Sequence, residues 1–489
     1  MGKTNIILAG LILVLALGLR LANLNSLPVF ADESIYVRWA QVMQAEPSLR
    51  FLPLSDGKQP LYMWALMPVL KVVSDPLIAG RCLTALIGTG TVVGIALLSW
   101  IFFKDRRLAL ITALLWAVIP FAVFFERLAL VDAMLTFFVV WGVVFFSWSV
   151  KHLRWDFSML AGFSLGFAYL TKSPAVFALA FLPTLLIFSW SQRREKNYFL
   201  RLLLLLSTVY CLAFGMYQIL RLGPEFHMIA IRNKDYLRPL SQVLANPLDP
   251  LVPHLRDGIK FFWYFLTPAG ILMAVWGLIS GRKNFLRERL ILSLWWLAPI
   301  IIQAFIAQVF TARYLLYTVP FAVILLALGI NNLGKLKYWA LGLVVISSVF
   351  LDCLLLTKPQ TLPLPRIERA GYLEEWTSGY GIKEVSEYIK KIPGPIVVGS
   401  EGFFGTPFSA LQMYLNDYPN IRVVGVGSYI DSVSDKLTNA RKDNQVFLVV
   451  NSSRFHADPS EIGLELISSY SKATAPNGTR EELLFFKVK

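Results

Sequence analysis

The residues best suited to chemistry in this chain are charged side chains that border long apolar runs. In chain order they are Asp32, Glu33, Lys58, Arg81, Arg127, Asp132, Lys172 and Arg313. Ionisable groups at the membrane edge are costly to keep there, so by default they indicate a function. A carboxylate can deprotonate a hydroxyl group, and Lys and Arg can stabilise the charge on a departing phosphate. The pattern therefore predicts group transfer from a phosphate-linked donor.

The two adjacent carboxylates, Asp32 and Glu33, precede an amphipathic stretch. Asp32 is expected to cap a helix that begins near Glu33, which would keep its carboxylate ionised beside backbone N–H groups. An apolar face follows at helical spacing and predicts a helix lying in the membrane interface; it consists of Tyr36, Trp39, Ala40 and Met43. The competing interpretation is an ordinary helix cap without a catalytic role.

Each of the other charged residues also has a structural interpretation. Arg127 and Asp132 could pair with each other and stabilise a turn. Lys172 could serve only to set the topology of a short loop. Arg313 could extend to the membrane interface without a ligand, and Arg81 is better suited to anchor a helix end than to bind a ligand.

The composition is that of a membrane protein. Of 489 residues, 56% are hydrophobic and 16% are charged, whereas soluble domains carry about 25% charged residues. The formal net charge of +15 could suggest nucleic-acid binding. Most Lys and Arg, however, fall in short loops between apolar runs, where they set topology. We therefore expect a multi-pass membrane protein with the lipid bilayer, and no nucleic acid, as its partner.

Stretches of about 20 mostly apolar residues can span a bilayer. About eleven are present, at residues 5–22, 79–102, 108–124, 131–150, 157–171, 174–190, 199–220, 260–280, 289–307, 314–331 and 338–356. Residues 60–73 are too short to span and predict a second interfacial helix, so that interfacial helices occupy about 32–73. The fold prediction is a polytopic α-helical membrane domain over residues 1–356.

Alternate loops of this domain are rich in Lys and Arg. They contain Lys3, residues 104–107, 151–154, 193–201, 281–289 and 334–337. The positive-inside rule places these loops and the N-terminus in the cytoplasm. The remaining loops, which carry Lys58, Arg127, Lys172 and Arg313, then face outward together with the C-terminal region.

No motif in the chain is typical of nucleotide, metal or serine-hydrolase chemistry. An Asp-x-Asp pair, a P-loop and Gly-x-Ser-x-Gly are all lacking, and the four histidines are scattered. We therefore expect no metal site and no cofactor, and no motif requires a divalent metal. A reaction on the outer face needs a donor that already carries its energy, and a lipid-phosphate-linked sugar is such a donor.

The composition changes near residue 357. Short buried strands are predicted in GPIVVGSE, NIRVVGVG and NQVFLVVNSS, and helical patterns lie between them. This alternation predicts a small parallel α/β domain over residues 357–489, soluble and extracytoplasmic. A passive structural cap and a binding or lid role are both open interpretations of this domain.

Several of these motifs together resemble a known family over roughly residues 1–355. They are Asp32-Glu33, Lys58-Gln-Pro-Leu-Tyr62, Arg81, Arg127-Leu-Ala-Leu-Val-Asp132, Leu170-Thr-Lys172 and Arg313-Tyr314-Leu-Leu. In this order the chain resembles the GT-C membrane glycosyltransferases of the protein O-mannosyltransferase and aminoarabinose (lipid A) transferase type, families 39 and 83. The sequence departs from the family at Gln59, where a proline is usual, which weakens the match beside Lys58.

The resemblance implies inverting transfer of a sugar from a polyprenyl-phosphate donor to a hydroxyl group on a lipid, polysaccharide or protein acceptor. It implies Asp32 as general base and Glu33 as a residue that orients the acceptor. The donor phosphate would contact Lys58, Arg127, Arg313 and Lys172. Supporting positions would be Arg81, Asp132, Tyr62 and Tyr314. The expected location is the plasma membrane.

Two other classes of protein compete with this interpretation. A transporter or lipid flippase would show internal repeats and polar groups near the middle of the bilayer. We find no repeat, and the charges cluster at the outer edge. A membrane-anchored receptor that acts through its C-terminal domain would leave these outer charges without a role.

Overall fold

The computed structural model describes residues 3–280 and 285–489 and divides into two compact units. The first, which we call the helical unit, comprises Met1–Leu24, Arg50–Tyr62 and Arg81–Thr357. The second, which we call the mixed unit, comprises Asn25–Leu49, Met63–Gly80 and Lys358–Lys489. The predicted domain boundary at residues 356 and 357 stays a prediction, and the mixed unit adds two earlier segments to the C-terminal region.

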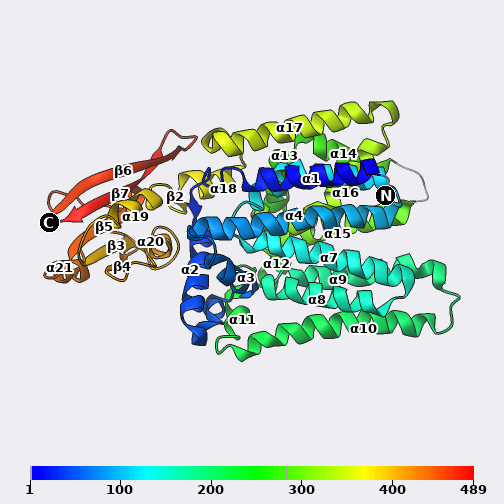
Figure 1. The fold of residues 1–489 in the computed structure, drawn as a ribbon, viewed down its shortest axis with the longest axis horizontal. Coiled ribbons are helices and arrows are strands. Elements are labelled where there is room, and N and C mark those ends of the chain that lie inside the picture. Colours follow the sequence, from blue (N-terminus) through cyan, green and yellow to red (C-terminus); the bar gives the residue numbers. More distant parts are fainter. Residues whose placement is uncertain (1–2, 281–284) are drawn as a thin grey trace. The chain divides into compact units, whose positions relative to one another are not determined.

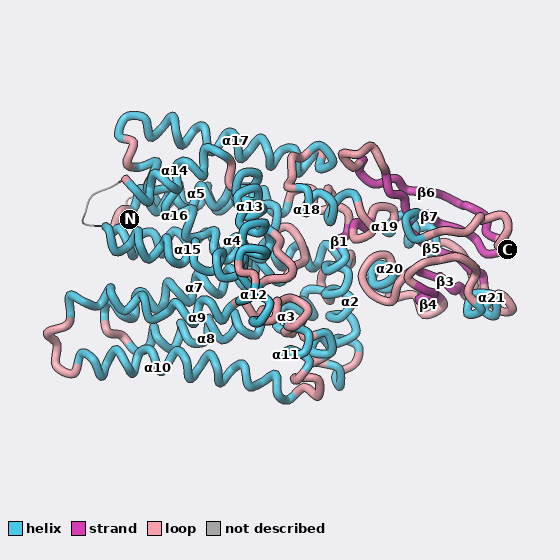
Figure 2. The backbone as a smooth tube through the Cα atoms, turned by 180° about the vertical axis from the view of Figure 1, so that it is seen from behind, coloured by secondary structure: helices cyan, strands magenta, loops and turns pink. Residues whose placement is uncertain are grey.

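Long apolar helices run side by side in the helical unit (Figures 1 and 2). They are α1 (Lys3–Leu21), α4 (Pro76–Phe103), α5 (Arg106–Val118), α6 (Pro120–Phe125), α7 (Val131–His152), α8 (Trp155–Thr171), α9 (Ala175–Phe181) with its 3-10 continuation η3 (Leu182–Gln192), α10 (Tyr198–Tyr217), α13 (Leu248–Phe265), α14 (Pro268–Ile279), α15 (Leu286–Ile306), η6 (Ala312–Thr318) with α16 (Val319–Asn331), and α17 (Lys337–Thr357). Shorter elements are η2 (Leu52–Asp56), α11 (Met228–Asn233) and α12 (Leu240–Ala245).

Within residues 3–280 and 285–489, eight helices are long and apolar enough to cross a membrane. A ninth span results if α13 and α14, which meet at a bend of 110°, count as one. The chain is therefore a multi-pass membrane protein, as predicted, although the sequence suggested about eleven spans. The difference lies at α8, which has 17 residues, and at 108–124, where a break before Pro120 separates α5 from α6.

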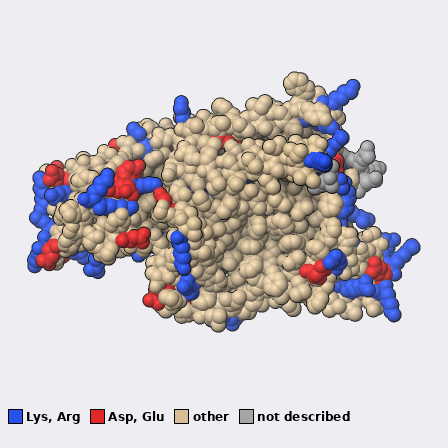
Figure 3. Space-filling view, in the orientation of Figure 1, with Lys and Arg blue, Asp and Glu red and all other residues tan. Residues whose placement is uncertain are grey.

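Loops that the sequence assigns to the cytoplasm gather at one end of the helical unit. Lys151 Nζ donates to the Ile101 carbonyl at 2.6 Å, and Gln192 donates to the Lys151 carbonyl. A cavity at the same end is lined from three further loops, with Asp105 and Arg289 on its walls. Figure 3 shows Lys and Arg gathered at this end of the helical unit, on the right of the view, and a broad surface beside them that carries few charges. Residues 281–284 of the predicted basic loop lie outside the described residues.

Two glycines allow an unusually close contact between α14 and α16. A Cβ atom added at Gly277 would lie 1.9 Å from the Leu325 carbonyl oxygen, and one added at Gly329 would lie 1.9 Å from the Met273 carbonyl oxygen. The two backbones therefore touch directly. Membrane helices gain no hydrophobic free energy by leaving lipid for each other, so their association depends on close packing. Small residues such as glycine allow this close packing.

The mixed unit is built on a five-stranded sheet in the order β4-β3-β5-β7-β6. Its strands are β3 (Ile396–Glu401), β4 (Ile421–Gly427), β5 (Gln445–Asn451), β6 (Leu464–Thr474) and β7 (Arg480–Val488), and its main helices are α19 (Ile382–Ile389), α20 (Phe408–Tyr414) and α21 (Asp435–Ala440). β3 pairs in parallel with β4 and β5, as the sequence predicts. The antiparallel β6–β7 hairpin was not predicted.

The mixed unit also contains α2 (Ala31–Ala45), most of α3 (Leu61–Leu70) and a two-residue ladder. In this ladder β1 (Val29–Phe30) pairs antiparallel with β2 (Ser378–Gly379). The segment that leads into Asp32 is thus joined by hydrogen bonds to a segment near the end of the chain.

The predicted apolar face of α2 is present but is covered by protein. Trp39 is 7% exposed and its ring centroid lies 5.7 Å from that of Phe404. Met43 is fully buried, and Gln41 Nε2 donates to the Met413 carbonyl at 3.0 Å. The expectation that this face lies in the membrane interface is therefore wrong, because loop 402–407 and α20 occupy it.

Candidate functional site

Three cations that the sequence singles out lie together at one end of the helical unit. Lys58 follows η2, Lys172 lies in the turn between α8 and α9, and Arg313 lies in η6. Arg313 and Lys58 are both close enough to Lys172 to repel its charge. We call these three residues the Lys172 group.

Asp132 and Tyr314 contact the Lys172 ammonium group. Lys172 Nζ lies 2.6 Å from Asp132 Oδ1 and 3.9 Å from the centroid of the Tyr314 ring. The guanidinium carbon of Arg313 lies 5.2 Å from the same centroid. Asp132 is buried in the first turn of α7, where the helix dipole favours a negative charge. Asp132 thus pairs with Lys172 and not, as the alternative interpretation had it, with Arg127.

Lys58 is held by Tyr236, a residue that the sequence analysis did not identify. Lys58 Nζ donates to Tyr236 Oη at 2.5 Å. Gly57 ends η2 with φ +67°, and a Cβ there would lie 2.6 Å from Arg232 Cβ. Arg232 in turn pairs with Asp56 at 2.8 Å. The turn that presents Lys58 is therefore fixed on both sides.

Backbone hydrogen bonds join the segment with Tyr236 to the segment that leads into Arg313. The Arg238 amide donates to the Ile306 carbonyl at 2.8 Å, and the Gln308 amide donates to the Tyr236 carbonyl at 2.8 Å. Tyr236 belongs to short helices and turns between α10 and α13, where no motif marks it. Only its contact with Lys58 reveals its place in the site.

The cations of the Lys172 group remain accessible. The side chains of Lys58, Lys172 and Arg313 are half-buried, whereas Asp132, the partner of Lys172, is buried. Gln59 Nε2 beside them donates to Ser173 Oγ at 2.8 Å. Partly desolvated cations with neighbouring hydroxyl groups form strong, charge-assisted hydrogen bonds to phosphate.

Arg127 and Arg81 lie in a separate, buried group. Both are at most 2% exposed. Their guanidinium groups donate to carbonyls at the end of α1 and just beyond it, with partners Leu19 at 2.6 Å and Asn23 at 2.9 Å for Arg127, and Leu24 at 2.5 Å for Arg81. They therefore satisfy the free carbonyls of a helix end. The structure thus places Arg127 among backbone groups and not in the Lys172 group.

A buried ion pair completes this arginine group. Arg20 Nη2 lies 2.5 Å from Glu126 Oε2, and both side chains are fully buried. Asp352 of α17 is also buried and lies close to Arg127 and Arg20. A buried charge is tolerated when it is paired in this way. The group fastens α1 to α6 and α17.

Asp32 and Glu33 belong to the mixed unit, at the start of α2. The helix begins at Ala31, so Asp32 is its second residue and not its cap. Glu33 is fully buried, and its Oε2 accepts a hydrogen bond from the Phe30 amide at 2.9 Å. The expectation that Asp32 caps the helix is therefore wrong. The carboxylate of Glu33, which lies in the first turn of the helix, accepts the hydrogen bond from the backbone amide of the N-cap residue Phe30. Asp32 remains half-buried.

The remaining predicted positions add no ligand set for a metal. Tyr62 is fully buried at the start of α3. Within residues 3–280 and 285–489, no group of three or more His, Cys, Asp and Glu side chains is arranged to hold a metal ion.

Comparisons with known proteins bear on this geometry. The family model of dolichyl-phosphate-mannose-protein mannosyltransferases matches residues 53–221, a stretch that contains Lys58, Arg127, Asp132 and Lys172. No curated protein is a significant match to the sequence.

Solved structures match over almost the whole chain. The crystal structure of ArnT from Cupriavidus metallidurans in the apo state is 13% identical, with a TM-score of 0.59, over 98% of this chain and 97% of that one. The same protein bound to undecaprenyl phosphate is 12% identical, with a TM-score of 0.62, over 99% and 98%. The oligosaccharyltransferase of Archaeoglobus fulgidus is 12% identical, with a TM-score of 0.50, over 91% and 68%.

At these identities the likeness shows the fold. The chain is a polytopic helical membrane protein with the GT-C fold and a C-terminal α/β region, as predicted. The resemblance to the protein O-mannosyltransferase type is confirmed over residues 53–221, and the likeness to ArnT is one of fold.

Proposed function

We propose that the protein is a membrane glycosyltransferase that moves a sugar from a polyprenyl-phosphate donor to an acceptor hydroxyl group. The observation that carries this proposal is the Lys172 group. Three cations from segments far apart in the sequence meet at one end of the helical unit, beside tyrosines and the carboxylate of Asp132. The structural neighbour bound to undecaprenyl phosphate supports a donor of this chemical class.

The proposed reaction is a single displacement. Asp32 takes the proton of the acceptor hydroxyl, whose oxygen forms a bond to the anomeric carbon of the sugar. The bond from that carbon to the phosphate oxygen breaks, and its electron pair stays on the polyprenyl phosphate. Lys58, Lys172 and Arg313 stabilise this charge. One displacement inverts the anomeric centre, and the phosphate leaves as a stable anion without a general acid.

Other predicted residues take supporting roles in this proposal. Tyr314 and Asp132 position the Lys172 ammonium group, and Tyr236 positions Lys58. Arg127 and Arg81 stabilise the end of α1 and do not contact the donor. Glu33 acts mainly as the cap of α2, which fixes the backbone on which Asp32 stands.

The orientation in the membrane is also proposed. The basic loops at one end of the helical unit face the cytoplasm according to the positive-inside rule. The Lys172 group and the C-terminal region then face outward, at the plasma membrane.

The test is sugar transfer by the purified full-length protein from a panel of polyprenyl-phosphate sugars. Asp32→Asn is expected to lower kcat by roughly 100-fold or more, which is the contribution of a general base. Lys172→Met is expected to lower transfer because the leaving phosphate loses a cation. Asp156→Asn is the matched control, since Asp156 is half-exposed and pairs only with Arg154 in the described chain.

An Asp32→Asn variant that transfers sugar at the wild-type rate would remove Asp32 as the base. Movement of a lipid-linked sugar across sealed vesicles without any transfer would favour the flippase instead.

A further inference from the structure

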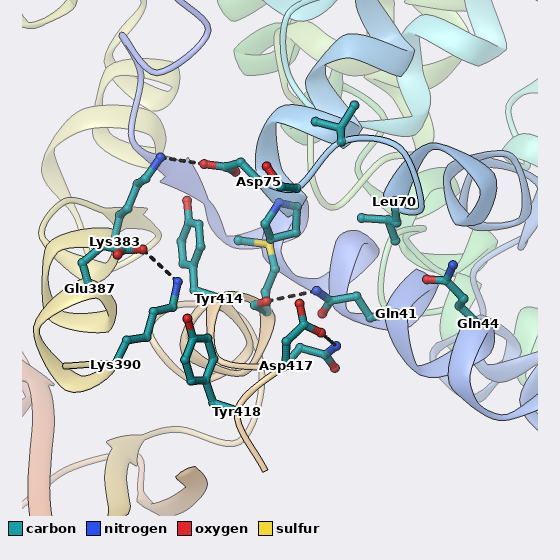
Figure 4. Close-up of a pocket in the computed structure, with 15 residues that line it drawn as sticks. Gln41, Gln44, Leu70, Asp75, Lys383, Glu387, Lys390, Tyr414, Asp417 and Tyr418 are labelled. Carbon is teal, nitrogen blue, oxygen red and sulfur yellow. Dashed lines mark hydrogen bonds and ion pairs between the residues drawn. The ribbon is translucent and has the colours of Figure 1, made fainter. Parts of the chain in front are cut away.

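A cleft of 610 Å³ opens in the mixed unit, on a side of α2 that the proposed chemistry does not use (Figure 4). Its walls come from α2, from the loop that follows α3, from α19 and from the end of α20. This volume lies within the range of about 300–1,000 Å³ that is usual for binding pockets. All four walls belong to the same compact unit.

The polar groups that line the cleft suit a ligand rich in hydroxyl groups. An amide comes from Gln44, a phenol from Tyr418 and a hydroxyl from Ser74, whereas the Asn416 amide is bonded to Arg38 and Asp417. Amide and phenol groups both donate and accept hydrogen bonds, and so do the hydroxyls of a sugar. The Tyr418 ring, 37% exposed, adds an apolar face at the rim.

The charges of the cleft argue against a phosphate-bearing ligand. Lys383 Nζ lies 2.6 Å from Asp75 Oδ2, and Lys390 Nζ lies 2.8 Å from Glu387 Oε1. Figure 4 shows both ammonium groups turned toward these carboxylates. Asp417 adds a further negative charge. Both lysines of the lining are therefore paired, and its slight excess of negative charge disfavours an anionic ligand.

The cleft lies away from Asp32 along α2. At 1.5 Å per residue, Gln41 and Gln44 are about 13 Å and about 18 Å from Asp32 along the helix axis. Gln41 is also about half a turn round the helix from Asp32. A ligand that fills the cleft while its reacting hydroxyl meets Asp32 must therefore be a chain several units long.

From these observations we infer that the cleft is a holding site for the acceptor, and that the acceptor is a neutral oligosaccharide chain. A polypeptide acceptor fits less well, since peptides usually add to an open strand edge or place apolar side chains in a groove, and helices and a loop form this cleft. The inference rests on the proposed function and specifies the class of its acceptor.

The first test measures binding of the full-length protein to an array of neutral oligosaccharides, acidic oligosaccharides and Ser/Thr-rich peptides. Binding is expected for neutral chains and is expected to strengthen from disaccharides to hexasaccharides. Ser74→Trp, which fills the cleft from an exposed loop position, and Tyr418→Ala are each expected to weaken it about tenfold. Tyr429→Ala and Gln445→Ala are the matched controls outside the cleft.

The second test is acceptor kinetics on the same preparations. Cleft variants are expected to raise KM for a long oligosaccharide and to leave kcat and donor KM unchanged, which a merely structural defect would not do. Peptide binding in place of oligosaccharide binding, no oligosaccharide binding, or unchanged binding in both cleft variants would overturn the inference. Sugar transfer that still depends on Asp32 would in those cases leave the proposed function standing. Loss of all transfer in the wild-type protein would refute the function itself.

Discussion

Glu401 is a buried carboxylate at the end of β3. Its two oxygens accept hydrogen bonds from Asn451 of β5, from the backbone amide at 2.8 Å and from Nδ2 at 2.6 Å. Lys472 Nζ donates to Asn451 Oδ1 at 2.5 Å from the other side. Burial raises the pKa of Glu401 to about 7, although these hydrogen bonds oppose the shift.

This raised pKa makes the sheet sensitive to pH. The folded protein keeps a proton on Glu401 that the unfolded chain releases near pH 4.5. The resulting stabilisation is complete below that pH and is lost as the pH rises through 7. A shift of this size corresponds to about 3 kcal/mol.

The prediction is that Glu401→Gln removes this dependence. Near pH 5 the variant is expected to protect β3 and β5 less than the wild type from hydrogen exchange, corrected for the intrinsic exchange rate, because an amide nitrogen cannot accept a hydrogen bond from Asn451. From pH 5 to pH 8 the protection of the wild type is expected to fall while that of the variant stays constant, because glutamine carries no charge to bury. Glu465→Gln, at a half-exposed position of β6, is the control. Parallel behaviour of Glu401→Gln and wild type across this range would contradict the assignment.

At the scale of single residues, the sequence marks charged positions but not their partners. Lys58, Lys172 and Arg313 stand out because each interrupts an apolar context. Their assembly depends on loops whose contacts leave no pattern in the sequence, and Tyr236 is the clearest case. Arg127 shows the reverse, since the same kind of signal led to a residue that is enclosed by backbone carbonyls.

Among the elements, α14 and α16 depend on direct backbone contact. Gly277→Ala or Gly329→Ala would place a methyl group 1.9 Å from a carbonyl oxygen of the other helix. Because neither atom belongs to a flexible side chain, the helices must separate. Overpacking of this kind costs about 1–3 kcal/mol.

Thermal unfolding in detergent is the measurement for these variants. Both are expected to unfold at lower temperature than the wild type. Gly342→Ala in α17 is the matched control, because a Cβ there meets nothing within 4 Å, and an alanine in a helix interior is expected to stabilise by about 0.5–1 kcal/mol. Equal unfolding temperatures for all three variants would show that the α14–α16 contact is not tight.

Elements with strong periodicity were predictable, and those that depend on tertiary context were not. The apolar runs predicted most of the membrane helices, and the strand–helix alternation predicted β3, β4 and β5. β6 was not predicted as a strand because its sequence, LELISSYSKAT, is polar and half-exposed along most of its length. The apolar face of α2 was recognised but assigned to lipid, since periodicity shows that a face is buried without showing what covers it.

For the molecule as a whole, the proposed orientation predicts that one end of the helical unit is accessible from outside the cell and the other only from the cytoplasm. Cys82, Cys211 and Cys353 are the only cysteines in the sequence and can be replaced by alanine. Lys234→Cys, near the Lys172 group, is then expected to react with a membrane-impermeant thiol reagent in intact cells. Lys196→Cys, in a basic loop, is expected to react only after the membrane is permeabilised. Both positions are exposed, so the reverse pattern would invert the proposed orientation.

The β1–β2 ladder has a consequence for the biosynthesis of this chain. Val29 pairs with Gly379, so two residues that lie 350 positions apart must both leave the ribosome before the ladder can close. At about 5–20 residues per second, this interval is roughly 20–70 s. Until then the segment before α2 lacks its partner strand, while the membrane helices between them are being inserted. The backbone before Asp32 therefore reaches its final structure only after the last membrane helix has been made and the C-terminal region has begun to fold. A chain whose synthesis stops early cannot form this part of the proposed site.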